Sequence, residues 1–117
     1  MSHRIIWFDL PVIDLQRAIN FYSAVLDVEI TEMAPDVAVI SHEENEVSGC
    51  LYVKEGDRPS DHGVLLYMNV DGRLEYAVHA TEAHGGQVLR PIHQIGEWGN
   101  RAIILDTEGN RIALHSS

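Results

Sequence analysis

The spacing of apolar residues predicts two helices in this chain of 117 residues. The first is indicated by apolar side chains that recur at intervals of three and four, on one face of an α-helix: Leu15, Ala18, Ile19, Tyr22, Val25 and Leu26. Asp14 precedes them, and its carboxylate can accept a free backbone N–H of the first turn. A weaker stripe, at Leu74, Ala77, Val78 and Thr81, predicts a second helix that Gly85 and Gly86 end.

Short apolar segments bounded by turn-forming residues predict strands on either side of each helix. In the first half they are segments 4–12, 28–33, 36–42 and 47–54. In the second half they are 63–70, 87–90, 102–105 and 110–115, with 91–99 expected as a loop and 107–110 as a hairpin turn. Each half therefore reads as one strand, one helix and three further strands.

The same order of strands and helix occurs in both halves, and Asp14 and Asp71 occupy matching places before the two helices. We expect both aspartates to cap their helices. The prediction is an α+β fold of two tandem βαβββ units, residues 1–54 and 64–117, joined by a polar linker at 55–63 in a single domain. The units are expected to form curled mixed sheets around a cavity.

Charge excludes several function classes. The chain has 18 acidic residues against 8 Lys and Arg, a net charge of −10. Such a surface repels nucleic acid and anionic membranes, so neither is expected as a partner. No apolar run is long enough to span a bilayer and no signal peptide is evident, which predicts a soluble, cytoplasmic protein. The single cysteine, Cys50, precludes an intrachain disulfide.

Three segments carry a resemblance to a known family: DLQRAINFYSAVL near the start, AHGGQVLRPIHQIGEWG in the second half and DTEGNRIALHS at the end. With the two βαβββ units, they resemble the vicinal oxygen chelate superfamily, which includes glyoxalase I, bleomycin resistance proteins and extradiol dioxygenases. The nearest branch is that of small proteins related to lactoylglutathione lyase. The resemblance implies a cavity for a small molecule and a homodimer.

The resemblance also implies where the superfamily's enzymes hold a divalent metal, through His, Gln or Glu at four strand positions. Carried over, these positions fall at Trp7, at Leu65 or Leu66, at Ala113, and at Ser48 or Cys50. Because indole and alkyl side chains cannot ligate a metal, the prediction is that no cofactor is used. A displaced metal site at Asp9, His93 and His115 stays open, as does a metal-dependent lyase or dioxygenase.

Without a metal, aromatic and polar residues on the same strand faces predict a ligand pocket. Its expected members are Trp7, Asp9, Tyr67, Asn69, His93, Trp98, Arg101 and His115. Asp9 is a candidate general base if burial raises its pKa, and His115 a candidate proton shuttle. Both tryptophans could instead lie in the core or at a dimer interface. The predicted function is to bind or transform a small organic molecule, with non-catalytic sequestration as the alternative.

Overall fold

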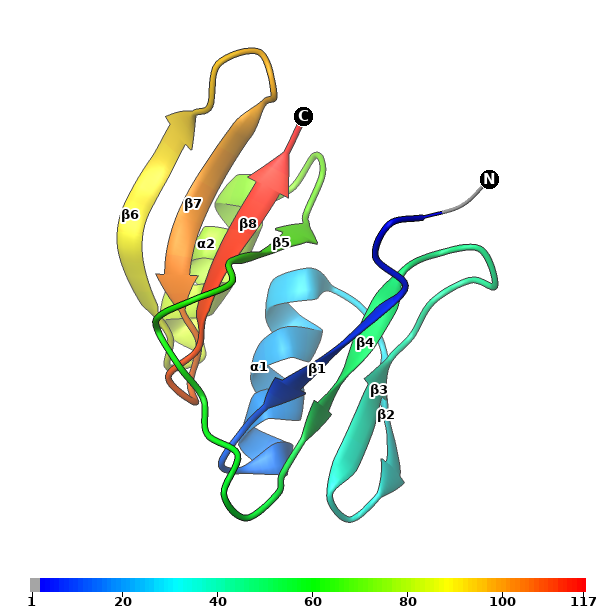
Figure 1. Ribbon diagram of the computed structural model, residues 1–117. Helices are drawn as coiled ribbons and strands as arrows, with labels where there is room; N and C mark the ends of the chain where they lie inside the picture. Colours follow the sequence, from blue (N-terminus) through cyan, green and yellow to red (C-terminus); the bar gives the residue numbers. More distant parts are fainter. Residues whose placement is uncertain (1–2) are drawn as a thin grey trace.

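The computed structural model describes residues 3–117 and contains two βαβββ units (Figure 1). The first consists of β1 (Trp7–Pro11), α1 (Leu15–Leu26), β2 (Ile30–Ala34), β3 (Val37–Ile40) and β4 (Ser48–Tyr52). The second consists of β5 (Leu66–Asn69), α2 (Leu74–Ala83), β6 (Gln87–Gln94), β7 (Asn100–Leu105) and β8 (Arg111–Ser116). The predicted α+β fold of tandem βαβββ units is confirmed. Within the described residues, no helix has the length and apolar character needed to cross a membrane.

Each unit forms its own four-stranded sheet, in the order β1-β4-β3-β2 and β5-β8-β7-β6. The first strand of each unit pairs in parallel with the last, and the remaining pairs are antiparallel. Neither sheet closes on itself. Helix α1 packs on the first sheet, α2 packs on the second, and the two helices pack on each other. The opposite face of each sheet therefore carries no helix. We call this the outer face.

The first helix begins as predicted, because the Asp14 carboxylate accepts the Arg17 N–H at 3.1 Å. The expected cap of the second helix is wrong. Arg73 occupies the N-cap position and forms no side-chain cap bond. Asp71 lies two residues before that position, and its carboxylate instead accepts the Ser117 N–H at 2.6 Å. The aspartate therefore anchors the chain's last residues to the start of the second helix.

The loop expected at 91–99 is also shorter than predicted. β6 continues through Pro91 to Gln94, and only residues 95–99 form the turn into β7. β6 is an edge strand with two register shifts against β7. A proline is tolerated there because Pro91 lies at one of these shifts, where the regular pairing with β7 is interrupted. The longer strand places His93 opposite Arg101.

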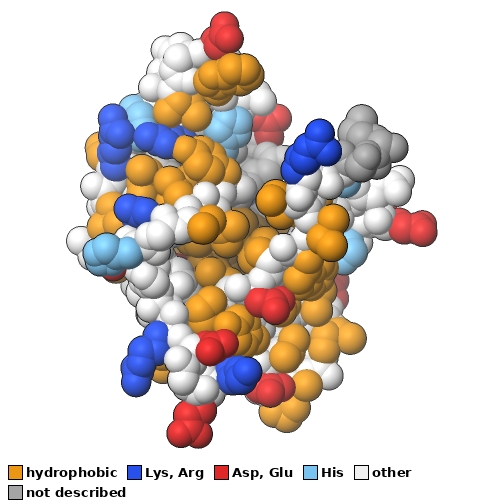
Figure 2. All heavy atoms as spheres, viewed as in Figure 1, with side chains coloured by type: hydrophobic (Ala, Val, Ile, Leu, Met, Phe, Trp, Pro, Cys, Tyr) orange, Lys and Arg blue, Asp and Glu red, His pale blue; other side chains and the backbone are white. Residues whose placement is uncertain are grey.

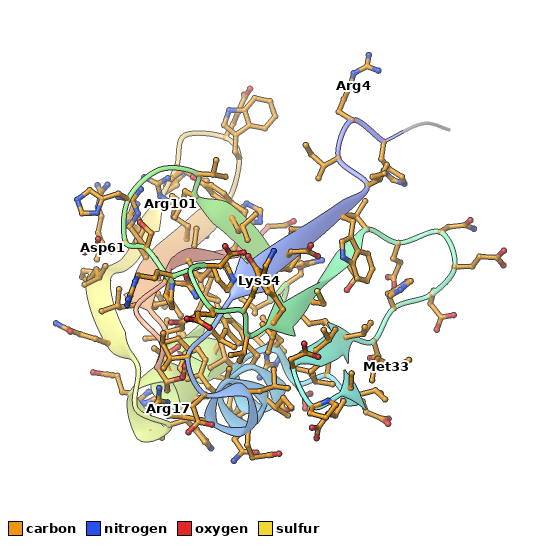
Figure 3. All side chains as sticks on the ribbon, turned by 60° about the horizontal axis from the view of Figure 1, so that its bottom comes forward. Arg4, Arg17, Met33, Lys54, Asp61 and Arg101 are labelled. Atoms are coloured by element: carbon orange, nitrogen blue, oxygen red, sulfur yellow. The ribbon has the colours of Figure 1, made fainter. Side chains whose placement is uncertain are left out.

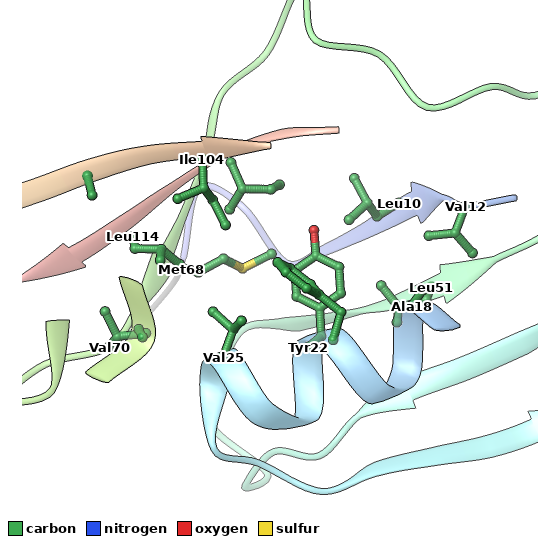
Figure 4. Packing of buried hydrophobic residues seen from close by; sticks show 14 of the residues in the cluster. Leu10, Val12, Ala18, Tyr22, Val25, Leu51, Met68, Val70, Ile104 and Leu114 are labelled. Carbon is green, nitrogen blue, oxygen red and sulfur yellow. The ribbon is translucent and has the colours of Figure 1, made fainter. Parts of the chain in front are cut away.

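The core lies between the helices and the inner faces of both sheets (Figure 4). Tyr22 of α1, Leu51 of β4 and Ile104 of β7 are among its largest fully buried side chains. Removing their apolar surface from water is the main favourable term in folding. Because this core is continuous from one unit to the other, the units form one body.

Polar contacts also join the units, at the turn between β7 and β8. The Glu108 carboxylate of that turn accepts the backbone N–H groups of Ile13 and Asp14, at 2.9 and 2.8 Å, and the Arg17 Nε–H at 2.7 Å. Nearby, the Tyr22 hydroxyl donates to Asp106 at 2.5 Å in the buried interior. These bonds hold the start of α1 against the second unit and so set the relative position of the two outer faces.

Candidate ligand-binding site

Five of the predicted site residues lie on the outer face of the second sheet, one or two from each strand. Strand pairing sets Asn69 of β5 opposite His115 of β8, His115 opposite Arg101 of β7, and Arg101 opposite His93 of β6. Tyr67 lies two residues before Asn69 and shares its face. The residues that alternate with these along β7 and β8, such as Ala102 and Leu114, point into the core. Alternation therefore directs the polar side chains away from the helix.

Arg101, which is labelled in Figure 3, bonds to two members of this group. Its Nε–H donates to Nε2 of His93 at 2.9 Å, and its Nη1 donates to the Tyr67 hydroxyl. The guanidinium carbon also lies 5.9 Å from the centre of the Tyr67 ring, within cation–π range. Since Nε2 of His93 accepts a hydrogen bond, the ring proton is on Nδ1, which lies 2.8 Å from the Pro91 carbonyl oxygen. His93 is therefore held as a neutral acceptor.

His115 borders the same group. Its ring centre lies 6.3 Å from that of Tyr67, in an edge-on arrangement. Its Nε2 lies 2.6 Å from the carbonyl oxygen of Trp98, so that nitrogen carries a proton. Trp98 thus contributes its backbone, while its indole is 73% exposed and does not cover the sheet in this conformation. We refer to Tyr67, His93, Arg101 and His115 as the Arg101 cluster.

The remaining two predicted residues lie on the first sheet. The Trp7 indole N–H donates to the Asp9 carboxylate at 3.0 Å, and the Cys50 thiol donates to the same oxygen at 3.1 Å. Burial, helped by the hydrogen bond and charge of Asp9, raises the pKa of Cys50 to about 11, so the thiol is protonated. Asp9 itself is exposed. No described contact joins this group to the Arg101 cluster.

A groove of about 640 Å³ runs between the two units, and of the predicted pocket residues only Tyr67 and Asn69 line it. Its lining is largely apolar and includes Ile5, Phe8, Val64, Leu66, Tyr67 and Met68; its polar members include His42, Ser48 and Asn69, and Glu46 is the one charged residue among the described residues that line it. Figure 2 shows hydrophobic side chains along the middle of this face, between the units. Tyr67 belongs to both the groove and the Arg101 cluster, so an apolar surface and a polar one meet at that residue.

Comparison with known proteins decides the family. The sequence model of one protein family, described as the Glyoxalase/Bleomycin resistance protein/Dioxygenase superfamily, matches residues 4–114. The chain belongs to this superfamily. A search of curated proteins found no match.

Solved structures of the superfamily share the fold at low sequence identity. A glyoxalase/bleomycin resistance protein from Albidiferax ferrireducens is 17% identical with a TM-score of 0.79, covering 98% of this chain and 100% of that one. A glyoxalase-related enzyme from Fulvimarina pelagi is 19% identical with a TM-score of 0.76, covering 99% and 89%. A glyoxalase I mutant from Zea mays is 20% identical with a TM-score of 0.70, covering 95% of this chain and 46% of that one.

The strand register resolves where the superfamily's metal positions fall. The Val12 N–H donates to the Tyr52 carbonyl in the first unit, as the Val70 N–H does to the His115 carbonyl in the second. Counting back from these matched bonds makes Cys50 equivalent to Ala113 and Leu65 equivalent to Trp7. The alternatives Ser48 and Leu66 are thereby set aside. The four positions are Trp7, Cys50, Leu65 and Ala113.

These four side chains do not fit a catalytic metal ion. Three have no donor atom for a metal, so the Cys50 thiol would be the only protein ligand, whereas a catalytic site needs about three. Among residues 3–117, no three His, Cys, Asp or Glu side chains gather as a metal-binding group. The displaced site considered for Asp9, His93 and His115 is therefore not assembled here, since Asp9 bonds to Trp7 and His93 to Arg101.

Proposed function

We propose that this superfamily member binds a small organic molecule in the groove between its two units and needs no metal ion to do so. The observation that carries the proposal is the junction at Tyr67, where a largely apolar groove of about 640 Å³ meets the hydrogen-bonded Arg101 cluster. Small-molecule sites in proteins have this volume and this combination of apolar walls with a few placed polar groups.

A ligand screen on chelator-treated protein tests the proposal. A ligand that binds only the folded state raises the melting temperature, and the increase grows with the logarithm of its concentration above its dissociation constant. We expect hits without added metal, and we expect Val64→Asp to weaken them. Val64 lines the groove and is 85% exposed, so the change places a charge in the groove without disturbing the core. Hits that require added divalent metal, or hits insensitive to Val64→Asp, would contradict the proposal.

A protein with such a site can either transform its ligand chemically or bind it without changing it. Mass spectrometry of each ligand after incubation separates them, because an enzyme yields a new product and a sequestering protein returns the ligand unchanged. A metal-dependent lyase or dioxygenase is the second candidate function, supported by the shared fold with the Zea mays glyoxalase I. Stoichiometric divalent metal in untagged protein would favour that candidate over ours.

We also propose that the protein is a homodimer. Ile6, in the segment before β1, is a large apolar side chain that is 79% exposed and does not line the groove. Light scattering should give twice the chain mass, and Ile6→Lys should shift it toward the monomer. Met33 is the matched control, because it is 66% exposed but lies in β2 at the far edge of the first sheet.

We also propose that the protein is cytoplasmic, because a lone thiol such as that of Cys50 suits a reducing compartment. Fractionation of the host cell would test this location.

A further inference from the structure

Arg101 carries a charge that no carboxylate in the described chain neutralises. Within residues 3–117, the only ion pairs are Arg17 with Glu108 and His62 with Asp61. Arg101 donates two of its five N–H groups to neutral acceptors, His93 and Tyr67, and three remain. The other described Lys and Arg residues except Arg17 also lack an ion pair, but Arg101 differs from them in donating to two neutral side chains.

The sheet around Arg101 continues this pattern. The four strands of the second sheet contain three arginines, two histidines and no acidic residue. Figure 2 shows Lys, Arg and His side chains gathered over the second unit. The potential of this sheet is therefore favourable to an anion, although the protein as a whole repels one.

The guanidinium is also held in place before any ligand arrives. His93 is fixed by its bond to the Pro91 carbonyl and in turn fixes Nε of Arg101, while Tyr67 fixes Nη1. Because the Tyr67 oxygen accepts from Arg101, its own O–H is free to donate. Such preorganisation lowers the entropic cost of binding.

We propose that the ligand is a carboxylate on an apolar body, with its charged end on Arg101 and Tyr67 and its body in the groove. The inference rests on the proposed function and names its ligand class. A guanidinium edge matches the two oxygens of a carboxylate. The single negative charge of a carboxylate is balanced by Arg101 alone, since His93 is neutral. The largely apolar lining beyond Tyr67 requires the rest of the ligand to be apolar.

Calorimetric titration of matched acids and amides tests the class. The probes are phenylacetate, naphthylacetate and octanoate, each compared with its primary amide, and phenyl phosphate as a dianion. In the wild-type protein each acid that binds should do so at least about tenfold more tightly than its amide, because hydrogen bonds to charged groups exceed neutral ones by that margin. Arg101→Gln should abolish this preference, so that each acid and its amide bind with about the same affinity.

Failure of the inference and failure of the proposed function give different results. Equal affinity of acids and amides, an acid preference that survives Arg101→Gln, or tighter binding of phenyl phosphate would overturn the carboxylate assignment while leaving the groove intact. No binding of any probe, or binding insensitive to Val64→Asp, would overturn the function itself. Circular dichroism confirms that each variant is folded before titration.

His93 is a positioning residue in this account, and its variants provide a second test. His93→Gln retains an acceptor for the Arg101 Nε–H, whereas His93→Leu removes it. We expect the acid-to-amide affinity ratio to stay within a few-fold of wild type in the first and to fall several-fold in the second. A merely structural role would weaken acids and amides equally and leave the ratio unchanged, which would contradict the assignment.

Discussion

The contact between Glu108 and the start of α1 makes the most direct prediction about how the two units are held together. The side chain of Glu108 has no exposed surface, and its carboxylate accepts from two backbone N–H groups, from Arg17 and from Thr107. Glu108→Gln keeps the size of the side chain and removes the charge. The amide also turns N–H groups toward Arg17 and Thr107, which need acceptors.

The magnitude follows from the pKa of Glu108. Burial opposes ionisation, but the hydrogen bonds from Arg17, Asp14, Thr107 and Ile13 outweigh it and lower the pKa from 4.5 to about 2. A folded-state pKa below the unfolded value stabilises the protein above pH 4.5, and this stabilisation is lost as the pH falls toward 2. The shift corresponds to about 3 kcal/mol at pH 7 and about 1.5 kcal/mol at pH 3.

Urea denaturation followed by far-ultraviolet circular dichroism measures this contribution. At pH 7, Glu108→Gln should lower the free energy of unfolding by about 3 kcal/mol and the melting temperature by roughly 10 °C. At pH 3 the difference from wild type should be about half as large. Glu97 is the matched control, because it is exposed in the turn between β6 and β7, and Glu97→Gln should change the stability by less than about 0.5 kcal/mol.

Two results would refute this reasoning. The first is a Glu108→Gln protein as stable as wild type at pH 7, which would mean that the hydrogen bonds do not compensate burial. The second is a loss of stability equal at pH 7 and pH 3, which would mean that the charge of Glu108 is not the stabilising factor.

Three further predictions concern the interior and the first sheet. Tyr22→Phe removes the buried hydrogen bond to Asp106 and should cost about 1.5–3 kcal/mol in urea unfolding; no measurable cost would show that Asp106 does not need this donor. The raised pKa of Cys50 should slow its alkylation by iodoacetamide at pH 8 about 100-fold relative to a cysteine peptide. Asp9→Asn should speed this alkylation, and an unchanged rate in that variant would rule out the influence of the Asp9 carboxylate. Gly49→Ala should destabilise the protein by about 1–3 kcal/mol, because the added Cβ would lie 2.5 Å from a backbone carbonyl oxygen of β1, and wild-type stability would show that β1 moves freely.

Local pattern was sufficient for the elements of the fold. The three- and four-residue spacing from Leu15 to Leu26 predicted α1 within its observed bounds, since helix periodicity and an N-cap are properties of a short stretch of chain. Repetition of the same order predicted the two units. Alternation along the strand also predicted that Tyr67 and Asn69 share a face, and both are exposed in β5 while Met68 between them is buried.

Local pattern failed where the outcome depends on a partner distant in sequence. Asp71 was expected to cap α2 but bonds to Ser117, and the 91–99 segment is partly a strand because β7 is available to pair with it. The fourth metal position could not be assigned between Ser48 and Cys50 until the register of β4 against β1 was known. A one-residue change of register moves a side chain to the other face, and nothing within a strand's own sequence sets that register.

By itself, then, the sequence determined the helices, the duplicated strand order, the acidic surface and the side-chain chemistry available on each strand. Only the tertiary structure decided which of those side chains meet. Trp7 and Asp9 bond to each other and to Cys50, while Tyr67, His93 and Arg101 form a separate cluster on the other sheet. The physical reason is that periodicity reports the face of an element on which a residue lies, whereas contacts between strands depend on how whole sheets pair and pack through a shared core.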